Sequence, residues 1–133
     1  MEFLEAIRPT LAESDAPRAV VVSSMSSLQP NYPPLVDALL NRDEAAALEI
    51  SEQLAADERT ASLIYPSTKR AVSIWVRRQS VSEEWAGAGI PLNAVGPGIV
   101  ITPMTADLLA TPESAAFVDA VVPMPLNYHQ PPE

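Results

Sequence analysis

The sequence AVVVSSMSS at residues 19–27 joins a short apolar run to a group of four serines. The run at 19–22 is rich in β-branched residues, which is typical of a strand buried on both faces of a parallel sheet. The serines predict a polar segment at the carboxyl end of that strand. Residues 90–95, IPLNAV, predict a second buried strand, which opens into the turn GPG at 96–98.

Helical patterns separate and surround these two strands. Residues 65–86 predict a helix that begins near Pro66, because proline is tolerated in a first turn, and that ends at Gly87 and Gly89. Strands that alternate with helices indicate an α/β fold with a parallel sheet. Because two strands alone leave both sheet edges without partners, we expect a slice of a larger domain. Further helices are predicted at 2–13, where Pro9 marks an end or a kink, within 35–60, near 104–110 and near 112–120, and residues 124–133 form a proline-rich tail.

The composition narrows the classes of function. Of the 133 residues, 47% are hydrophobic, so the chain can build a packed core. Lys plus Arg number 8 against 17 Asp plus Glu, and the net charge of −9 argues against nucleic-acid binding. There is no cysteine, and His129 is the single histidine, so we expect no metal site. The start lacks the pattern of a signal peptide and no apolar run reaches about 18 residues, so we expect a soluble, cytoplasmic protein without a membrane partner.

Tyr65 and Lys69 stand four positions apart on the predicted helix. Residues at i and i+4 share a helix face, so the phenol and the ammonium group can lie side by side. A cation held beside a phenol favours the phenolate and makes it usable as an acid or base near neutral pH. Lys69 is the only lysine of the chain, and a lysine falls four positions after one of three tyrosines with a chance of about 0.02. The alternative interpretation is a core tyrosine and a solvated lysine.

Two other segments follow the predicted strands, where parallel α/β sheets bind their ligands. A serine hydroxyl within 23–27 could donate a hydrogen bond to a developing oxyanion, although serines that only cap and turn the chain would give the same pattern. The turn at 96–98 would let the backbone approach a flat ligand, with Thr102 offering a hydroxyl, or it is an ordinary turn at a strand end. The acidic residues of 35–60 indicate a solvated helix face, with an acidic interaction module as the less favoured alternative.

Together these segments resemble the short-chain dehydrogenase/reductase family. VVVSSMSS at 20–27 resembles the serine strand of that family, and YPSTKRAV at 65–72 resembles its Tyr-x-x-x-Lys helix. NAVGPGIVITPM at 93–104 resembles its Asn-Ala-x-x-Pro-Gly segment with the trailing threonine. A long helical insertion at 29–62 resembles the bacterial 3α-hydroxysteroid dehydrogenase/carbonyl reductase branch, whose members form dimers because the insertion covers the tetramer face.

The resemblance implies a Rossmann-like, doubly wound parallel sheet and a role for each matching residue. Tyr65 would be the general acid/base, and Lys69 would favour its phenolate and bind the nicotinamide ribose, so that both would contact the cofactor. Ser24 would orient and polarise the substrate carbonyl. The cofactor would be NAD or NADP. The residues expected to line its nicotinamide are Pro97, Gly98, Ile99, Val100 and Thr102.

The resemblance also implies parts that the sequence lacks. No glycine precedes Gly87, so the glycine-rich phosphate loop of the family is missing, and the closing strand would follow the tail. We therefore expect residues 1–133 to be one partial domain, truncated at both ends and inactive alone. The implied function is NAD(P)-dependent interconversion of a secondary alcohol and a ketone, with an apolar, steroid-like substrate. The alternative is a non-catalytic fragment that acts by association, as a homodimer or with a completing chain.

Overall fold

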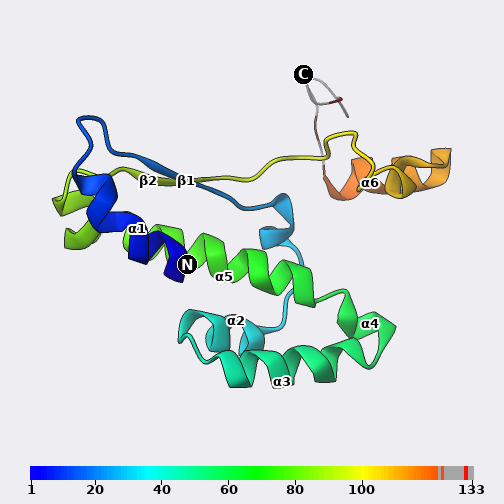
Figure 1. Ribbon diagram of the computed structural model, residues 1–133. Coiled ribbons are helices and arrows are strands. Elements are labelled where there is room, and N and C mark those ends of the chain that lie inside the picture. Colours follow the sequence, from blue (N-terminus) through cyan, green and yellow to red (C-terminus); the bar gives the residue numbers. More distant parts are fainter. Residues whose placement is uncertain (123, 125–130, 132–133) are drawn as a thin grey trace. The chain divides into compact units, whose positions relative to one another are not determined.

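The computed structural model describes residues 1–122, 124 and 131, and the chain divides into two compact units, Met1–Val95 and Gly96–Glu133. The proline-rich tail predicted at 124–133, with His129, lies outside the described residues except for Met124 and Pro131. The elements of the first unit are α1 (Glu2–Ala12), β1 (Ala19–Val22), the 3₁₀ turn η1 (Met25–Leu28), α2 (Pro33–Leu40), α3 (Glu44–Ala55), α4 (Glu58–Ala61), α5 (Ile64–Gln79), the π turn η2 (Glu83–Gly87) and β2 (Leu92–Val95) (Figure 1).

Strands β1 and β2 form a parallel pair, as their sequences predicted. Ala19 lies opposite Leu92, and Val22 lies opposite Val95. All helices of this unit except α1 lie between the two strands in the sequence, and α5 is the last long helix before β2 (Figure 1). A parallel pair requires such a crossover because its two strands must start from the same end.

The prediction that the first strand is buried on both faces is wrong within the described chain. Ala19 is buried, whereas the side chains of Val20 and Val22 are 57% and 63% exposed. The reason is that α1 and α5 pack on one face of the pair, and successive side chains of a strand point to opposite faces. Val95 of β2 is 48% exposed, so the open face of the pair carries three valines together with the exposed Asn93.

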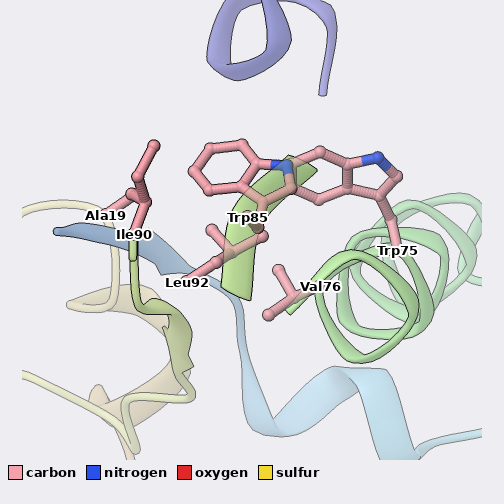
Figure 2. Close-up of a cluster of buried hydrophobic side chains, with 6 residues drawn as sticks. All are labelled: Ala19, Trp75, Val76, Trp85, Ile90 and Leu92. Carbon is pink, nitrogen blue, oxygen red and sulfur yellow. The ribbon is translucent and has the colours of Figure 1, made fainter. Parts of the chain in front are cut away.

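Two tryptophans form the centre of the core between α5 and the strands. Trp75 comes from α5 and Trp85 from η2, and their rings meet edge to face with centroids 6.2 Å apart and an interplanar angle of 86°. This is the geometry that the charge distribution of aromatic rings favours. Figure 2 shows both indoles together above Leu92 and Val76. The buried members of this cluster are Ala19, Trp75, Val76, Trp85, Ile90 and Leu92.

The predicted helix over 65–86 is shorter than expected. Helix α5 ends at Gln79, and Trp85 lies on the separate turn η2. The helix ends early because of tertiary packing: the chain must reverse direction to bring Trp85 back against Trp75. Gly89, whose φ is 73°, supplies the left-handed backbone that leads from η2 to β2.

The insertion predicted at 29–62 is helical and has a small core of its own. Helices α2 and α3 bury a cluster of Leu35, Ala38, Ala47 and Leu54, against which Ile64 of α5 packs. Two of its seven acidic residues are helix N-caps. The Asp43 side chain accepts from the N–H of Ala46, and the Asp57 side chain accepts from the N–H of Arg59. The other five are exposed, as the solvated-face interpretation predicted: Asp37, Glu44, Glu49, Glu52 and Glu58.

Ser67 ties the insertion to the first turn of α5. Its side chain is fully buried, donates to the carbonyl of Leu63 over 2.6 Å and accepts from the backbone N–H of Tyr32 over 2.8 Å. Tyr32 precedes α2, and Leu63 precedes α5, so one hydroxyl joins the two ends of the insertion.

The second unit contains η3 (Asp107–Leu109) and α6 (Pro112–Val121), where short helices were predicted. A capping box begins α6, with Thr111 and Ser114 each binding the backbone of the other. Among the described residues of this unit, Val118 and Val122 are buried, whereas Phe117 is 68% exposed. No helix within the described residues has both the length and the apolar character needed to cross a bilayer.

We expect Trp85→Ala to lower the free energy of unfolding by about 3–5 kcal/mol, because it removes a fully buried indole and its edge-to-face partner. Chemical denaturation followed by the fluorescence of Trp75 measures the change. Leu28→Ala is the matched control, since Leu28 is 74% exposed, and it should change stability little. Equal stabilities of the two variants would contradict this core.

We expect Ser67→Ala to loosen the insertion at 29–62, because the N–H of Tyr32 loses its acceptor, at a cost of about 1–3 kcal/mol. Hydrogen exchange of the backbone amides in α2 should then be faster than in the wild type. Ser62→Ala is the control, because the Ser62 hydroxyl binds only the local carbonyl of Arg59 in the described chain. Unchanged exchange in α2 would show that Ser67 does not hold the insertion.

Candidate active site

The carboxyl end of β1 and the first two turns of α5 meet at one place in the first unit. The backbone N–H of Ser23 donates to the carbonyl of Val95 over 2.7 Å, which extends the β1–β2 ladder by one residue. Beyond this point the chain leaves the sheet and enters η1. Helix α5 packs against both η1 and β2, so the strand end and the start of α5 are neighbours.

Lys69 links the helix directly to the strand end. Its Nζ donates to the carbonyl oxygen of Val22 over 3.2 Å and lies 5.6 Å from the centroid of the Tyr65 ring. The shared helix face predicted for these two side chains is therefore present, and the ammonium group lies within the range of a cation–π contact. Tyr65 is 54% exposed and Lys69 is half-buried, so the phenol is accessible to a ligand while the ammonium group is held by the protein.

Ser24 follows directly on this strand end. It has an extended backbone, with φ −163° and ψ 154°, and caps η1 by accepting the N–H of Ser26 over 3.1 Å. The cap uses the oxygen of Ser24 as an acceptor, so its hydroxyl hydrogen remains able to donate. The capping interpretation of the serines is thus correct for Ser24, and it leaves a donor function open.

Two serines that the sequence did not single out complete the contact between β1 and α5. The Ser23 side chain is 6% exposed and lies 2.7 Å from the Ser73 hydroxyl, one helical turn beyond Lys69. It also lies 3.5 Å from the carbonyl oxygen of Lys69. Sequence position gave no signal for this pair, because Ser23 and Ser73 are 50 residues apart.

The residues predicted to line a nicotinamide belong to the second unit, which is described separately from the first. The Ile99 N–H donates to Sδ of Met124 over 3.2 Å. Thr105 accepts the N–H of Thr102 over 3.0 Å and donates to the carbonyl of Val100 over 2.6 Å. The structure therefore brings Ser24, Tyr65 and Lys69 to one region of the first unit. The other predicted residues belong to the second unit: Pro97, Gly98, Ile99, Val100 and Thr102. Within the described residues, no cluster of three His, Cys, Asp or Glu side chains could hold a metal ion.

Comparison with curated proteins finds homologous dehydrogenases. The chain is 33% identical to 3α-hydroxysteroid dehydrogenase/carbonyl reductase of Comamonas testosteroni over 124 residues, which are 92% of this chain and 47% of that protein. It is also 33% identical to 3β-hydroxysteroid dehydrogenase 1 of Eggerthella lenta over 60 residues, 45% of this chain and 22% of that protein. No protein-family model matches.

Comparison with solved structures gives the same relationship. The 3α-hydroxysteroid dehydrogenase from Pseudomonas sp. B-0831, solved in complex with NADH, matches with a TM-score of 0.73 and 34% identity over 96% of this chain and 49% of that one. This confirms the predicted fold class, a segment of a Rossmann-like parallel α/β sheet. The chain spans about half the length of the two 3α-hydroxysteroid dehydrogenases that it matches. By sequence and by fold, the chain is homologous to about half of a 3α-hydroxysteroid dehydrogenase/carbonyl reductase, in agreement with its resemblance to the short-chain dehydrogenase/reductase family.

Proposed function

We propose that the protein carrying this chain is an NAD(P)-dependent oxidoreductase that interconverts a secondary alcohol and a ketone. The observation that carries the proposal is the position of the Lys69 ammonium group, which donates a hydrogen bond to the carbonyl of Val22 at the end of β1 and lies beside the Tyr65 ring. Ser24 leaves the same strand end. Homology to hydroxysteroid dehydrogenases over 92% of the chain supports it.

Tyr65 is the proposed general acid/base. Its phenol is exposed on the first turn of α5, and the Lys69 ammonium group lies 5.6 Å from the centroid of its ring. In the direction of reduction, Tyr65 donates its proton to the substrate oxygen. In the direction of oxidation, the phenolate takes the proton from the alcohol. A positioned group of this kind contributes a rate factor of about 10²–10⁴.

Ser24 is the proposed donor to the substrate oxygen. Its oxygen accepts from Ser26, which fixes the position of the side chain and leaves the hydroxyl hydrogen free to point at a ligand. A donor held in place before the reaction stabilises the negative charge that develops on the oxygen. Ser24 and Tyr65 would thus act on the same atom.

Lys69 fits the sugar of a nicotinamide cofactor. An ammonium group has three donors, and the bond to Val22 uses one of them, which leaves two for ribose hydroxyls. Bound nicotinamide supplies or accepts the hydride, while the protein orients the reactants. The residues proposed to line the nicotinamide are Pro97, Gly98, Ile99, Val100 and Thr102. Because no glycine precedes Gly87, we assign only the nicotinamide end of the cofactor to this chain, and the choice between NAD and NADP stays open.

An apolar, steroid-like alcohol or ketone is the proposed substrate. The second unit exposes Met104, Leu108 and Phe117 by 89%, 49% and 68%, which is apolar surface suited to a flat hydrocarbon. Val118 of the same unit is buried and does not add to this surface. The names of the hydroxysteroid dehydrogenases that the chain resembles support this substrate class.

Association is a second candidate function, and a separate observation favours it. The open face of the β1–β2 pair carries Val20, Val22 and Val95, all about half exposed or more, and an uncovered sheet face of this kind favours pairing. In this alternative the chain acts by binding a completing chain or a second copy of itself.

In the protein that carries this chain, we expect Tyr65→Phe to reduce kcat at least about 100-fold, because it removes the proton that the substrate oxygen receives. Oxidation of NADH by an apolar ketone, followed by absorbance, measures the rate. Tyr32→Phe is the matched control, since Tyr32 is 37% exposed and contacts Ser67 only through its backbone N–H. It should keep the wild-type rate. Equal rates for Tyr65→Phe and the wild type would remove Tyr65 from the mechanism.

If association is the function, the isolated chain should form a dimer or higher oligomer, and Val22→Lys should weaken it by placing a charge on the open sheet face. Sedimentation velocity at several concentrations measures this. Val81→Lys is the control, because Val81 is 79% exposed but lies outside both strands. A monomeric chain at every concentration would exclude self-association, and an equal effect of both lysines would exclude this face.

A further inference from the structure

We propose that Ser23 and Ser73 are positioning residues, a pair of hydroxyls, one buried and one half-buried, that holds α5 at the end of β1 and thereby sets the positions of Lys69 and Tyr65. The inference rests on the proposed function, because it assigns these serines a part in the same site. Neither serine touches the substrate or the cofactor in this proposal.

The Ser23 contacts join three elements at one point. Its backbone N–H donates to Val95 at the end of β2 over 2.7 Å, and its side chain lies 2.7 Å from the Ser73 hydroxyl of α5. The same side chain lies 3.5 Å from the backbone carbonyl oxygen of Lys69. Because Ser23 is only 6% exposed, water cannot readily replace these bonds.

The spacing along α5 makes this attachment relevant to the site. Tyr65, Lys69 and Ser73 follow one another at intervals of four residues, so they form one row along a single helix face. Ser73 binds Ser23, and Lys69 binds the carbonyl of Val22, the neighbouring residue of the strand. Two bonds from adjacent helical turns to adjacent strand residues fix both the rotation of α5 and its shift along its axis. Tyr65, one turn further, takes its position from them.

The two neighbouring serines then have different tasks. Successive side chains of an extended chain point to opposite sides, so Ser23 can face α5 while Ser24 leaves the sheet and caps η1. One serine anchors the helix that carries the phenol, and the next offers a hydroxyl to the substrate. The distance between the proposed donor, Ser24, and the proposed acid, Tyr65, therefore depends on the bond between the buried Ser23 and the half-buried Ser73.

The single lysine of the chain provides a direct test that does not depend on activity. An amine-specific acetylating reagent labels the ε-amine of Lys69 and the terminal amine, and peptide mass spectrometry separates the two sites. While Lys69 donates to Val22, its amine reacts slowly. We expect Ser73→Ala to raise the labelling rate of Lys69 at least about threefold, because the helix turn that carries Lys69 is then free to move.

Three further variants separate positioning from a general loss of stability. Ser80→Ala is the matched control, because the Ser80 hydroxyl binds only the Arg77 carbonyl in the described chain, and Lys69 should keep its labelling rate. Ser73→Thr keeps a hydroxyl and should restore slow labelling. The double variant Ser23→Ala with Ser73→Ala leaves neither hydroxyl of the pair unpaired, so it should regain thermal stability relative to the single variant and yet keep fast labelling.

In the protein that carries the chain, Ser73→Ala should lower kcat about 10-fold with KM unchanged, because a small displacement of Tyr65 affects the reaction more than binding. Wild-type labelling of Lys69 in Ser73→Ala, or the same increase in Ser80→Ala, would overturn the positioning role. If Tyr65→Phe keeps full activity, the proposed function fails, and the labelling rates still decide whether Ser23 and Ser73 hold Lys69.

Discussion

The bond from the Lys69 ammonium group to the carbonyl of Val22 is the contact on which the candidate site depends. It joins the face of α5 that carries Tyr65 to the carboxyl end of β1, the place where parallel α/β sheets bind ligands. The same ammonium group lies beside the Tyr65 ring, so a single cation serves both as a structural anchor and as the electrostatic neighbour of a phenol. Arginine would not replace it equivalently, because its planar group lacks the compact charge of an ammonium.

Helix α5 can hold this position because it is fixed on three sides. Trp75 packs with Trp85 against the inner face of the strands, and Ser67 binds the two ends of the helical insertion. The third side carries Ser73 and Lys69, which contact the end of β1, and Tyr65 beside them. Apolar burial gives the helix its stability, whereas the hydroxyl and ammonium contacts set its register, and the register determines where the phenol lies.

Local sequence patterns predicted those features of the site and fold that depend on local geometry. The juxtaposition of Tyr65 and Lys69 follows from a spacing of four on a helix, and the first strand follows from a short β-branched run. The end of α5 was not predictable, because it depends on the contact between Trp75 and Trp85 across a chain reversal. The Ser23–Ser73 bond joins residues 50 positions apart, and the exposure of Val22 depends on which strand faces are covered. Such features arise only from tertiary packing.

A crystal structure of the protein that carries this chain, with NAD and a ketone analogue bound, would test the central claim most directly. The account predicts that Lys69 keeps its contact with the Val22 carbonyl while its remaining donors bind the ribose. It also predicts that the hydroxyls of Ser24 and Tyr65 both lie within hydrogen-bond distance of the ketone oxygen. A ligand oxygen bound away from Tyr65, or a Lys69 side chain directed away from β1, would contradict it.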